Sequence, residues 1–154
     1  MTIEECKIET QAHIDKVRRY IRFFTDKLTD RAEKHDASKM GDIEAPIFAA
    51  HTANLSNIEF GSEEYKKELE ALKPALDHHY KYNRHHPQYF GEEGINGMNL
   101  IDIVEMLADW RASVERTQNG DIFKSIEINA ERFGIDEQFK KILINTARMM
   151  EEHQ

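Results

Sequence analysis

The chain has 154 residues, of which 40% are hydrophobic and 32% are charged. This length fits one domain with a single core, and this balance of residues is typical of a soluble globular protein rather than a disordered one. The net charge of -8 argues against broad, non-specific binding to nucleic acids, which requires a basic face.

Turn-forming residues are scarce, with 7 Gly and 3 Pro, so long helices are favoured. The single cysteine, Cys6, cannot form an internal disulfide, which suits a reducing compartment. The N-terminal segment is acidic and lacks the apolar stretch of a signal peptide, and no run approaches the roughly 18 apolar residues of a membrane span. We therefore expect one cytoplasmic domain over residues 1–154, an all-α bundle of about six to seven helices.

The first expected helix begins at a capping box formed by Thr2 and Glu5. Apolar residues then recur at three- and four-residue steps between 17 and 28, and His13 lies on the same helical face. A buried imidazole needs a partner, so His13 is either a core histidine bonded to the backbone or a metal ligand. Its position upstream of a His-Asp pair favours the ligand. A short turn is expected near Thr29.

A second helix is expected over residues 30–40, and it carries the adjacent pair His35 and Asp36. Neighbouring residues on a helix project about 100° apart, so both side chains can reach one ion. Neutral imidazole and carboxylate are ligands that divalent cations accept. Lys39 lies three residues after Asp36, on the same side of the helix. The simpler interpretation of such a pair is a solvated surface.

A third helix is expected over about 43–58. Glu44 and His51 could reach a site below this helix, but its spacing predicts that both are surface residues. Its core candidates are Ile43, Ile47, Phe48 and Leu55.

The segment Ser62 to Asn83 has the most regular helical pattern, and its inward residues follow alternating steps of four and three. This spacing makes His79 an inward residue, with His78 displaced by about 100°. Pro74 is expected to kink this helix or to start a new one. The predicted inward residues are Tyr65, Leu69, Leu72, Leu76, His79 and Asn83.

The next segment, 84–98, has the densest loop signals in the chain, with Pro87 and three glycines. It has no GxxxxGK[ST] pattern, so it is not a phosphate-binding P-loop. It begins with the pair His85 and His86. Loops held by a rigid scaffold often carry functional residues, although two exposed histidines before a proline would also fit this pattern.

A helix capped by Asn99 follows, with a core face predicted at Leu100, Ile103, Val104, Leu107 and Val114. Asp102, Glu105 and Asp109 share another face of this helix. This face is either a solvated acidic stripe, or it contributes Asp109 to a site while Asp102 and Glu105 lie nearer the edge. In the second interpretation Asp109 points into the bundle. Two closing helices are expected over 121–133, ending at Gly134, and over 136–150, with Phe139, Ile142, Leu143 and Thr146 inward.

Together these candidates follow the order H…HD…H…HH…D, which resembles the HD-domain superfamily of metal-dependent phosphohydrolases. The sequence HDASK at 35–39 is similar to the HDxGK motif of the branch that hydrolyses cyclic dinucleotides, with Ser38 in place of glycine. The paired histidines also look like that branch, although Pro87 stands where it has a glutamate and the loop has no GYP triplet. ADWRAS resembles the segment around the last metal-binding aspartate. The chain also resembles a group of phage and bacterial proteins with HDxSK, NRHHP and EMxxDW blocks.

The resemblance implies an HD-like helical domain that holds one or two divalent ions. One ion would be held by His13, His35, Asp36 and Asp109. A second would be held by His79 with His85 or His86, and Asp36 would bridge the two ions. Manganese, iron, cobalt, nickel, zinc and magnesium all stay open, because metal choice follows availability and geometry as much as ligand type.

The implied activity is hydrolysis of a phosphoester by a metal-activated water, with a small phosphorylated substrate such as a nucleotide or cyclic nucleotide. Lys39 and Arg84 are the candidate phosphate contacts, and each could equally be a solvated surface cation. Two alternatives stay open: a di-iron oxygenase of the same superfamily, and a non-catalytic helical binding protein stabilised by metal. A homodimer is also compatible, because small helical domains often leave one apolar face uncovered.

Overall fold

The computed structural model describes residues 1–55, 58, 62–116 and 119–152. Every regular element within these residues is helical, namely six α-helices and two 3-10 segments, which confirms the all-α prediction. The chain divides into two compact units, Met1–Lys34 and His35–Gln154. The HD-like, single-domain organisation stays a prediction. Within the described residues, no helix combines the length and the apolar character that crossing a membrane requires.

The first unit is the helix α1 (Ile3–Lys34), which begins at the predicted capping box. The Thr2 amide donates to Glu5 Oε2 at 2.7 Å, and the Glu5 amide donates to Thr2 Oγ1 at 3.2 Å. The turn predicted near Thr29 is wrong, because Thr29 Oγ1 donates to the Thr25 carbonyl at 2.9 Å and the helix continues. The buried stripe predicted around His13 is also wrong, since no residue of α1 is buried.

The second unit opens with a sharp change of backbone direction at Asp36, where φ is 54° and ψ is 17°. This left-handed conformation cannot continue a right-handed helix. The helix predicted over residues 30–40 is therefore wrong: α1 ends at Lys34, and a 3-10 segment, η1 (Ala37–Met40), follows. The His35–Asp36 pair lies at the junction between the two elements.

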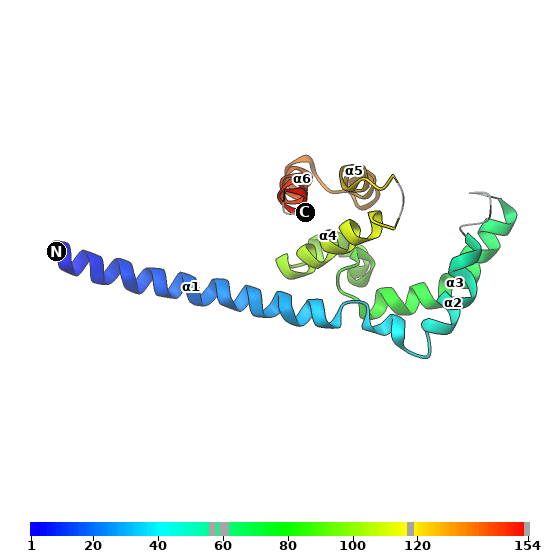
Figure 1. Cartoon of the computed structure of the whole chain (residues 1–154), viewed down its shortest axis with the longest axis horizontal. Coiled ribbons are helices and arrows are strands. Elements are labelled where there is room, and N and C mark those ends of the chain that lie inside the picture. The colour runs from blue at the N-terminus through cyan, green and yellow to red at the C-terminus, as the bar shows by residue number, and fades with distance from the viewer. Residues whose placement is uncertain (56–57, 59–61, 117–118, 153–154) are drawn as a thin grey trace. The chain divides into compact units, whose positions relative to one another are not determined.

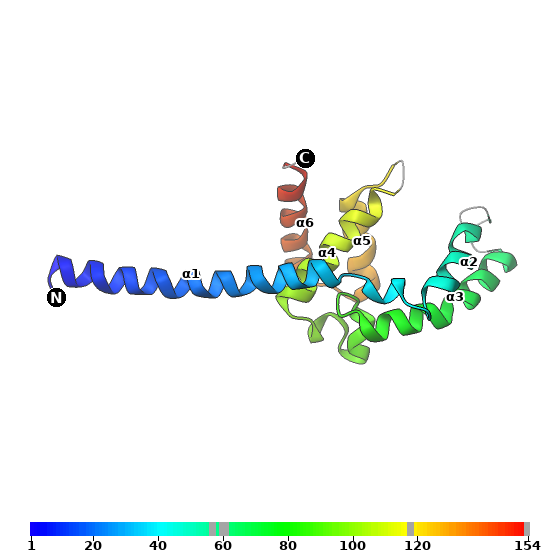
Figure 2. The same cartoon turned by 60° about the horizontal axis from the view of Figure 1, so that its bottom comes forward.

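The helices α2 (Ala45–Leu55) and α3 (Glu63–Tyr82) lie side by side in both views (Figures 1 and 2). Ser62 caps α3 by accepting the Tyr65 amide at 3.1 Å, and α3 continues through Pro74 as one element. His79 is buried, as predicted, whereas two predicted core residues, Ile43 and Leu69, are exposed. The predicted end of α2 falls partly on residues 56 and 57, and these, like the side chain of Leu55, lie outside the described part of the chain.

The predicted loop after α3 contains a 3-10 segment, η2 (Pro87–Gly97). It is interrupted at Gly91 and Gly94, which have φ values of 58° and 50°. L side chains rarely adopt this part of backbone space, which explains glycine at both positions. The predicted loop is thus a compact set of turns that leads from the paired histidines to the next helix.

Three further helices complete the second unit: α4 (Leu100–Val114), α5 (Ile122–Phe133) and α6 (Glu137–Glu151). The two predicted caps are present, Asn99 before α4 and Gly134, with φ 64°, after α5. Asp121 and Asp136, where the two closing helices were expected to begin, are the N-caps of α5 and α6. These helices bury one apolar cluster formed by Met106, Leu107, Trp110, Ile122, Ile126, Ala130, Ile135, Leu143 and Ala147.

The predicted inward face of α4 is partly wrong. Leu107 is buried, but Leu100 and Val104 are exposed. The reason is that α4 uses two faces, one apolar face towards α5 and α6 and one acidic face that includes the fully buried Asp102. On α6, Leu143 is buried as predicted and Ile142 is exposed.

Candidate metal centre

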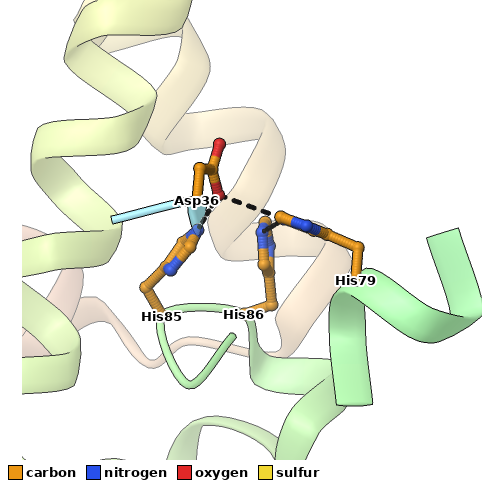
Figure 3. Close-up of side chains that lie close together, drawn as sticks. All are labelled: Asp36, His79, His85 and His86. Carbon is orange, nitrogen blue, oxygen red and sulfur yellow. Dashed lines mark hydrogen bonds and ion pairs between the residues drawn. The ribbon is translucent and has the colours of Figure 1, made fainter. Parts of the chain in front are cut away.

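Four side chains of the second unit converge on one point: Asp36, His79, His85 and His86 (Figure 3). Each offers one ligand atom, and these atoms all lie within 4.8 Å of one another. Asp36 comes from the start of η1, His79 from the last turn of α3, and the paired histidines from the segment before η2. Such a cluster of imidazoles and one carboxylate can bind a divalent metal ion.

One oxygen of Asp36 is the centre of the cluster. Asp36 Oδ1 lies 3.2 Å from His79 Nε2 and 3.5 Å from His85 Nε2, and Figure 3 shows the two rings approaching it from two sides. His86 Nε2 lies 2.9 Å from His79 Nε2. Among the described residues, Asp36 Oδ1 and His85 Nε2 are buried atoms without a hydrogen-bond partner. Buried polar atoms normally have partners, and a bound cation would supply one to both atoms.

Two carboxylates, the fully buried Glu44 and the largely buried Glu105, hold the far sides of these rings. Glu44 Oε2 lies 2.9 Å from His79 Nδ1, and Glu105 Oε1 lies 3.1 Å from His85 Nδ1. Because an ionised carboxylate only accepts hydrogen bonds, each ring carries its proton on Nδ1 when neutral. The lone pair of Nε2 then faces Asp36. This carboxylate–histidine arrangement is the usual support of histidine ligands in metal sites.

A second group of potential ligands adjoins the first and consists of His35, His85 and Asp109. His35 Nε2 lies 3.6 Å from Asp36 Oδ2 and 3.7 Å from Asp109 Oδ1, and its Nδ1 lies 3.0 Å from Glu105 Oε1. The two oxygens of Asp36 therefore face different sets of ligands. A carboxylate in this position can bridge two ions.

The predicted ligands that belong to the second unit are thus brought together. His13 lies exposed on α1, in the other unit, and its part in the site stays a prediction. Of the two predicted phosphate contacts, Lys39 lies at the cluster, with Nζ 2.6 Å from Asp36 Oδ2. Arg84 is paired with Asp102, its Nη2 2.9 Å from Asp102 Oδ2.

The protonation states favour metal binding at the inner ligands. Burial raises the pKa of Asp36, but the neighbouring His79 ring and the hydrogen bond from Lys39 outweigh it and hold that pKa well below its usual range. Burial, together with the neighbouring His85 and His79, lowers the pKa of His86 to about 3, so this ring is neutral and can act as a ligand.

The outer group carries a proton in the metal-free protein. The neighbouring carboxylates of Asp109 and Glu105 raise the pKa of His35 to about 10. Burial raises the pKa of Asp109, but the neighbouring His35 more than offsets it and lowers that pKa. An ion bound at this group would therefore displace a proton from His35.

The supporting residues are the ones that sequence analysis missed. Glu44, expected on the surface, is 0% exposed, and it also lies 2.6 Å from His78 Nδ1. Glu105, expected near an edge, supports two histidines. A sequence signal existed for Glu105, which lies one helical turn before Asp109 on the same face. Glu44 lies in the turn before α2, where no periodicity could reveal it.

Comparisons with known proteins give a family and no function. Neither a search of curated proteins nor a search of solved structures found a match to the chain. The sequence model of a family of unknown function, DUF5662, matches residues 2–149. The chain therefore belongs to this family.

Proposed function

We propose that the chain is a metal-dependent phosphohydrolase that acts on a nucleotide or a related small phosphorylated substrate. One observation carries the proposal: the Asp36 oxygen that has no hydrogen-bond partner faces two histidines whose far nitrogens are held by the carboxylates of Glu44 and Glu105. Pre-oriented lone pairs around an ionised carboxylate are what a catalytic ion requires of its protein ligands.

In this proposal, Asp36, His79, His85 and His86 hold one ion, and His35 and Asp109 hold a second with the other oxygen of Asp36. A set this rich in imidazole favours manganese, iron, cobalt, nickel or zinc over magnesium. When bound, such ions lower the pKa of a coordinated water and so provide hydroxide at neutral pH.

The remaining chemistry falls to residues beside the cluster. Lys39 is partly exposed, and its ammonium group, 2.6 Å from Asp36, can donate to a phosphate oxygen. The chain as a whole has a net charge of -8 and would repel a phosphate, and the positive charge of Lys39 reduces this repulsion at the site. A cytoplasmic setting is part of the same proposal.

A second candidate is a di-iron oxygenase. One observation favours it: the two oxygens of Asp36 face two different groups of potential ligands, and both groups include His85. A third candidate is a helical binding protein that is stabilised by metal. It would use the same ligands but would catalyse no reaction.

The first experiment measures metal content by mass spectrometry on tag-free protein, together with phosphate release from a panel of nucleotides. Asp36→Asn is the test variant, since it keeps the shape of the side chain and removes its charge. His51→Ala is the control, because His51 is another partly buried histidine bound to a carboxylate, Glu68, at 2.7 Å.

We expect near-stoichiometric metal and metal-dependent phosphate release in the wild type and in His51→Ala, and loss of both in Asp36→Asn. Stoichiometric iron with a visible charge-transfer band and no phosphate release would favour the oxygenase. Bound metal with neither phosphate release nor oxygenase activity would favour the non-catalytic binding protein. Absence of metal from wild-type protein, even after supplementation, would overturn the proposed centre.

A further inference from the structure

We propose that Arg84 and Asp102 form a positioning pair for the metal centre, and that Arg84 acts through His85 and His86 rather than by contacting substrate. The inference rests on the proposed metal centre. It assigns a different role to a cation that the sequence suggested as a phosphate contact.

The pair is bidentate. Arg84 Nε donates to Asp102 Oδ1 at 3.1 Å, and Arg84 Nη2 donates to Asp102 Oδ2 at 2.9 Å. Asp102 is 0% exposed, and its Oδ2 also accepts the Asn99 amide at 3.0 Å, as part of the capping box of α4. The carboxylate is therefore fixed to the start of α4. A planar guanidinium matched to it has one orientation.

Two aromatic rings also contact the guanidinium of Arg84, whose side chain is 38% exposed. Its guanidinium carbon lies 5.1 Å from the centre of the Tyr89 ring and 4.9 Å from that of Phe90. Phe90 packs closely against Gly97, since a Cβ added at position 97 would lie only 2.7 Å from Phe90 Cδ1. The Asp102 carboxylate and the two rings fix the orientation of the guanidinium, so a phosphate would have to compete with Asp102 for it.

The pair also sets the register of the histidine segment against α4. Arg84 binds Asp102, and the next residue, His85, binds Glu105, one turn further along the same face of α4. A shift of this segment by one residue would move His85 away from Glu105 and take the Arg84 guanidinium away from the buried carboxylate of Asp102, and removing the opposite charge from a buried carboxylate is strongly unfavourable. The correct seating of Arg84 thus determines which ring nitrogen faces Asp36.

The test uses the full chain loaded with Co²⁺, whose visible absorption reports the geometry of its ligands, and inorganic phosphate as the probe of anion binding. Arg84→Lys keeps the positive charge but removes the bidentate fork and the stacking. Asp102→Asn is the second variant, used if Arg84→Lys does not fold. Arg111→Lys is the matched control, since Arg111 also lies on α4 and is partly buried, with Nε 2.6 Å from Glu151 Oε1.

We expect Arg84→Lys to weaken Co²⁺ binding at least tenfold and to change the visible spectrum, while phosphate affinity of the Co²⁺-loaded protein stays within twofold. Arg111→Lys should leave all three unchanged. If Arg84→Lys keeps the Co²⁺ affinity and spectrum, the positioning role is overturned, and a weaker phosphate affinity in that case would identify Arg84 as a substrate contact. Failure of wild-type protein to bind Co²⁺ would instead overturn the proposed metal centre itself.

Discussion

The second unit contains two buried regions of opposite chemistry, and α4 contributes to both. On one face, Met106, Leu107 and Trp110 join an apolar cluster with α5 and α6. On another face, Asp102, Glu105 and Asp109 meet Arg84 and the histidines. Transfer out of water lowers the free energy of the apolar side chains in the first region, whereas it raises the free energy of the charged and polar side chains in the second.

The difference predicts how the two regions are stabilised. Each fully buried apolar side chain contributes about 1.5–3 kcal/mol, with no need for a partner of opposite charge. Buried charges are stable only when paired, and an ionic cluster contributes little net stability even then. We therefore infer that the apolar cluster supports the fold, and that the histidine cluster depends on that support and on a bound cation.

The largest expected effect comes from the apolar cluster. Ile126 is 0% exposed, and Ile126→Ala should lower the free energy of unfolding by about 2–5 kcal/mol through lost burial and a cavity. Metal content per folded chain should not change. Urea unfolding measures the first quantity and mass spectrometry the second. The control is Ile128→Ala on the same helix, where the exposed side chain predicts a change under about 0.5 kcal/mol. Loss of metal from folded Ile126→Ala would contradict the separation of the two regions.

Metal removal should act on the other region. At a free metal concentration of about 100 times Kd, the ion adds about 2.7 kcal/mol to stability, and a chelator should remove this amount. Hydrogen exchange should then quicken in the last turn of α3 and in η2, but not in α5 and α6. Uniform quickening over all of these helices would show that metal and apolar cluster stabilise one cooperative unit.

A smaller effect is expected from a single supporting carboxylate. Glu44→Gln removes the charge that fixes the His79 proton on Nδ1, and such changes weaken metal binding by about 10–100-fold. Titration against a competing chelator measures the affinity. Glu68→Gln is the matched control, because Glu68 holds His51 at 2.7 Å outside the cluster. Equal effects of the two substitutions would rule out a specific role for Glu44.

The smallest effect concerns Lys39. Its ammonium competes with any cation for Asp36 Oδ2, so Lys39→Gln should raise metal affinity, by about 1 kcal/mol or roughly fivefold for a partly exposed pair. The same substitution should weaken phosphate binding. Calorimetry with metal and then with phosphate separates the two effects. Lys34→Gln, which breaks an exposed pair with Asp30 on α1, should change neither. A fall in both affinities would show that Lys39 is needed to shape the site.

The sequence was most informative where periodicity and residue type agreed. The alternating steps of α3 identified His79 as the inward histidine, and the resemblance of the motif order to the HD-domain superfamily pointed to the other members of the cluster. Periodicity could not reveal Glu44, which lies in a turn, or the burial of Asp102, which depends on Arg84 closing over it from another segment. Such residues become buried through contacts distant in sequence.

The errors around α1 have a different cause. Thr29 is a weak helix former, and its hydroxyl can bond a carbonyl within the helix instead of ending it. The helix ends at Lys34, and two residues later Asp36 has a left-handed conformation that no local pattern predicts, because Asp is compatible with helix, turn and cap alike.

That conformation restricts which amino acids can stand at position 36. Among the described residues, Asp36 is the one non-glycine with positive φ, at 54°. Glycine and asparagine adopt this region readily, whereas β-branched residues are strongly disfavoured there. A saturation library scored for protein abundance should therefore retain Asp, Asn and Gly and deplete Val and Ile. Scored for metal, it should retain Asp alone. The residue at position 36 thus meets two separate requirements, a left-handed backbone conformation and a negatively charged side chain.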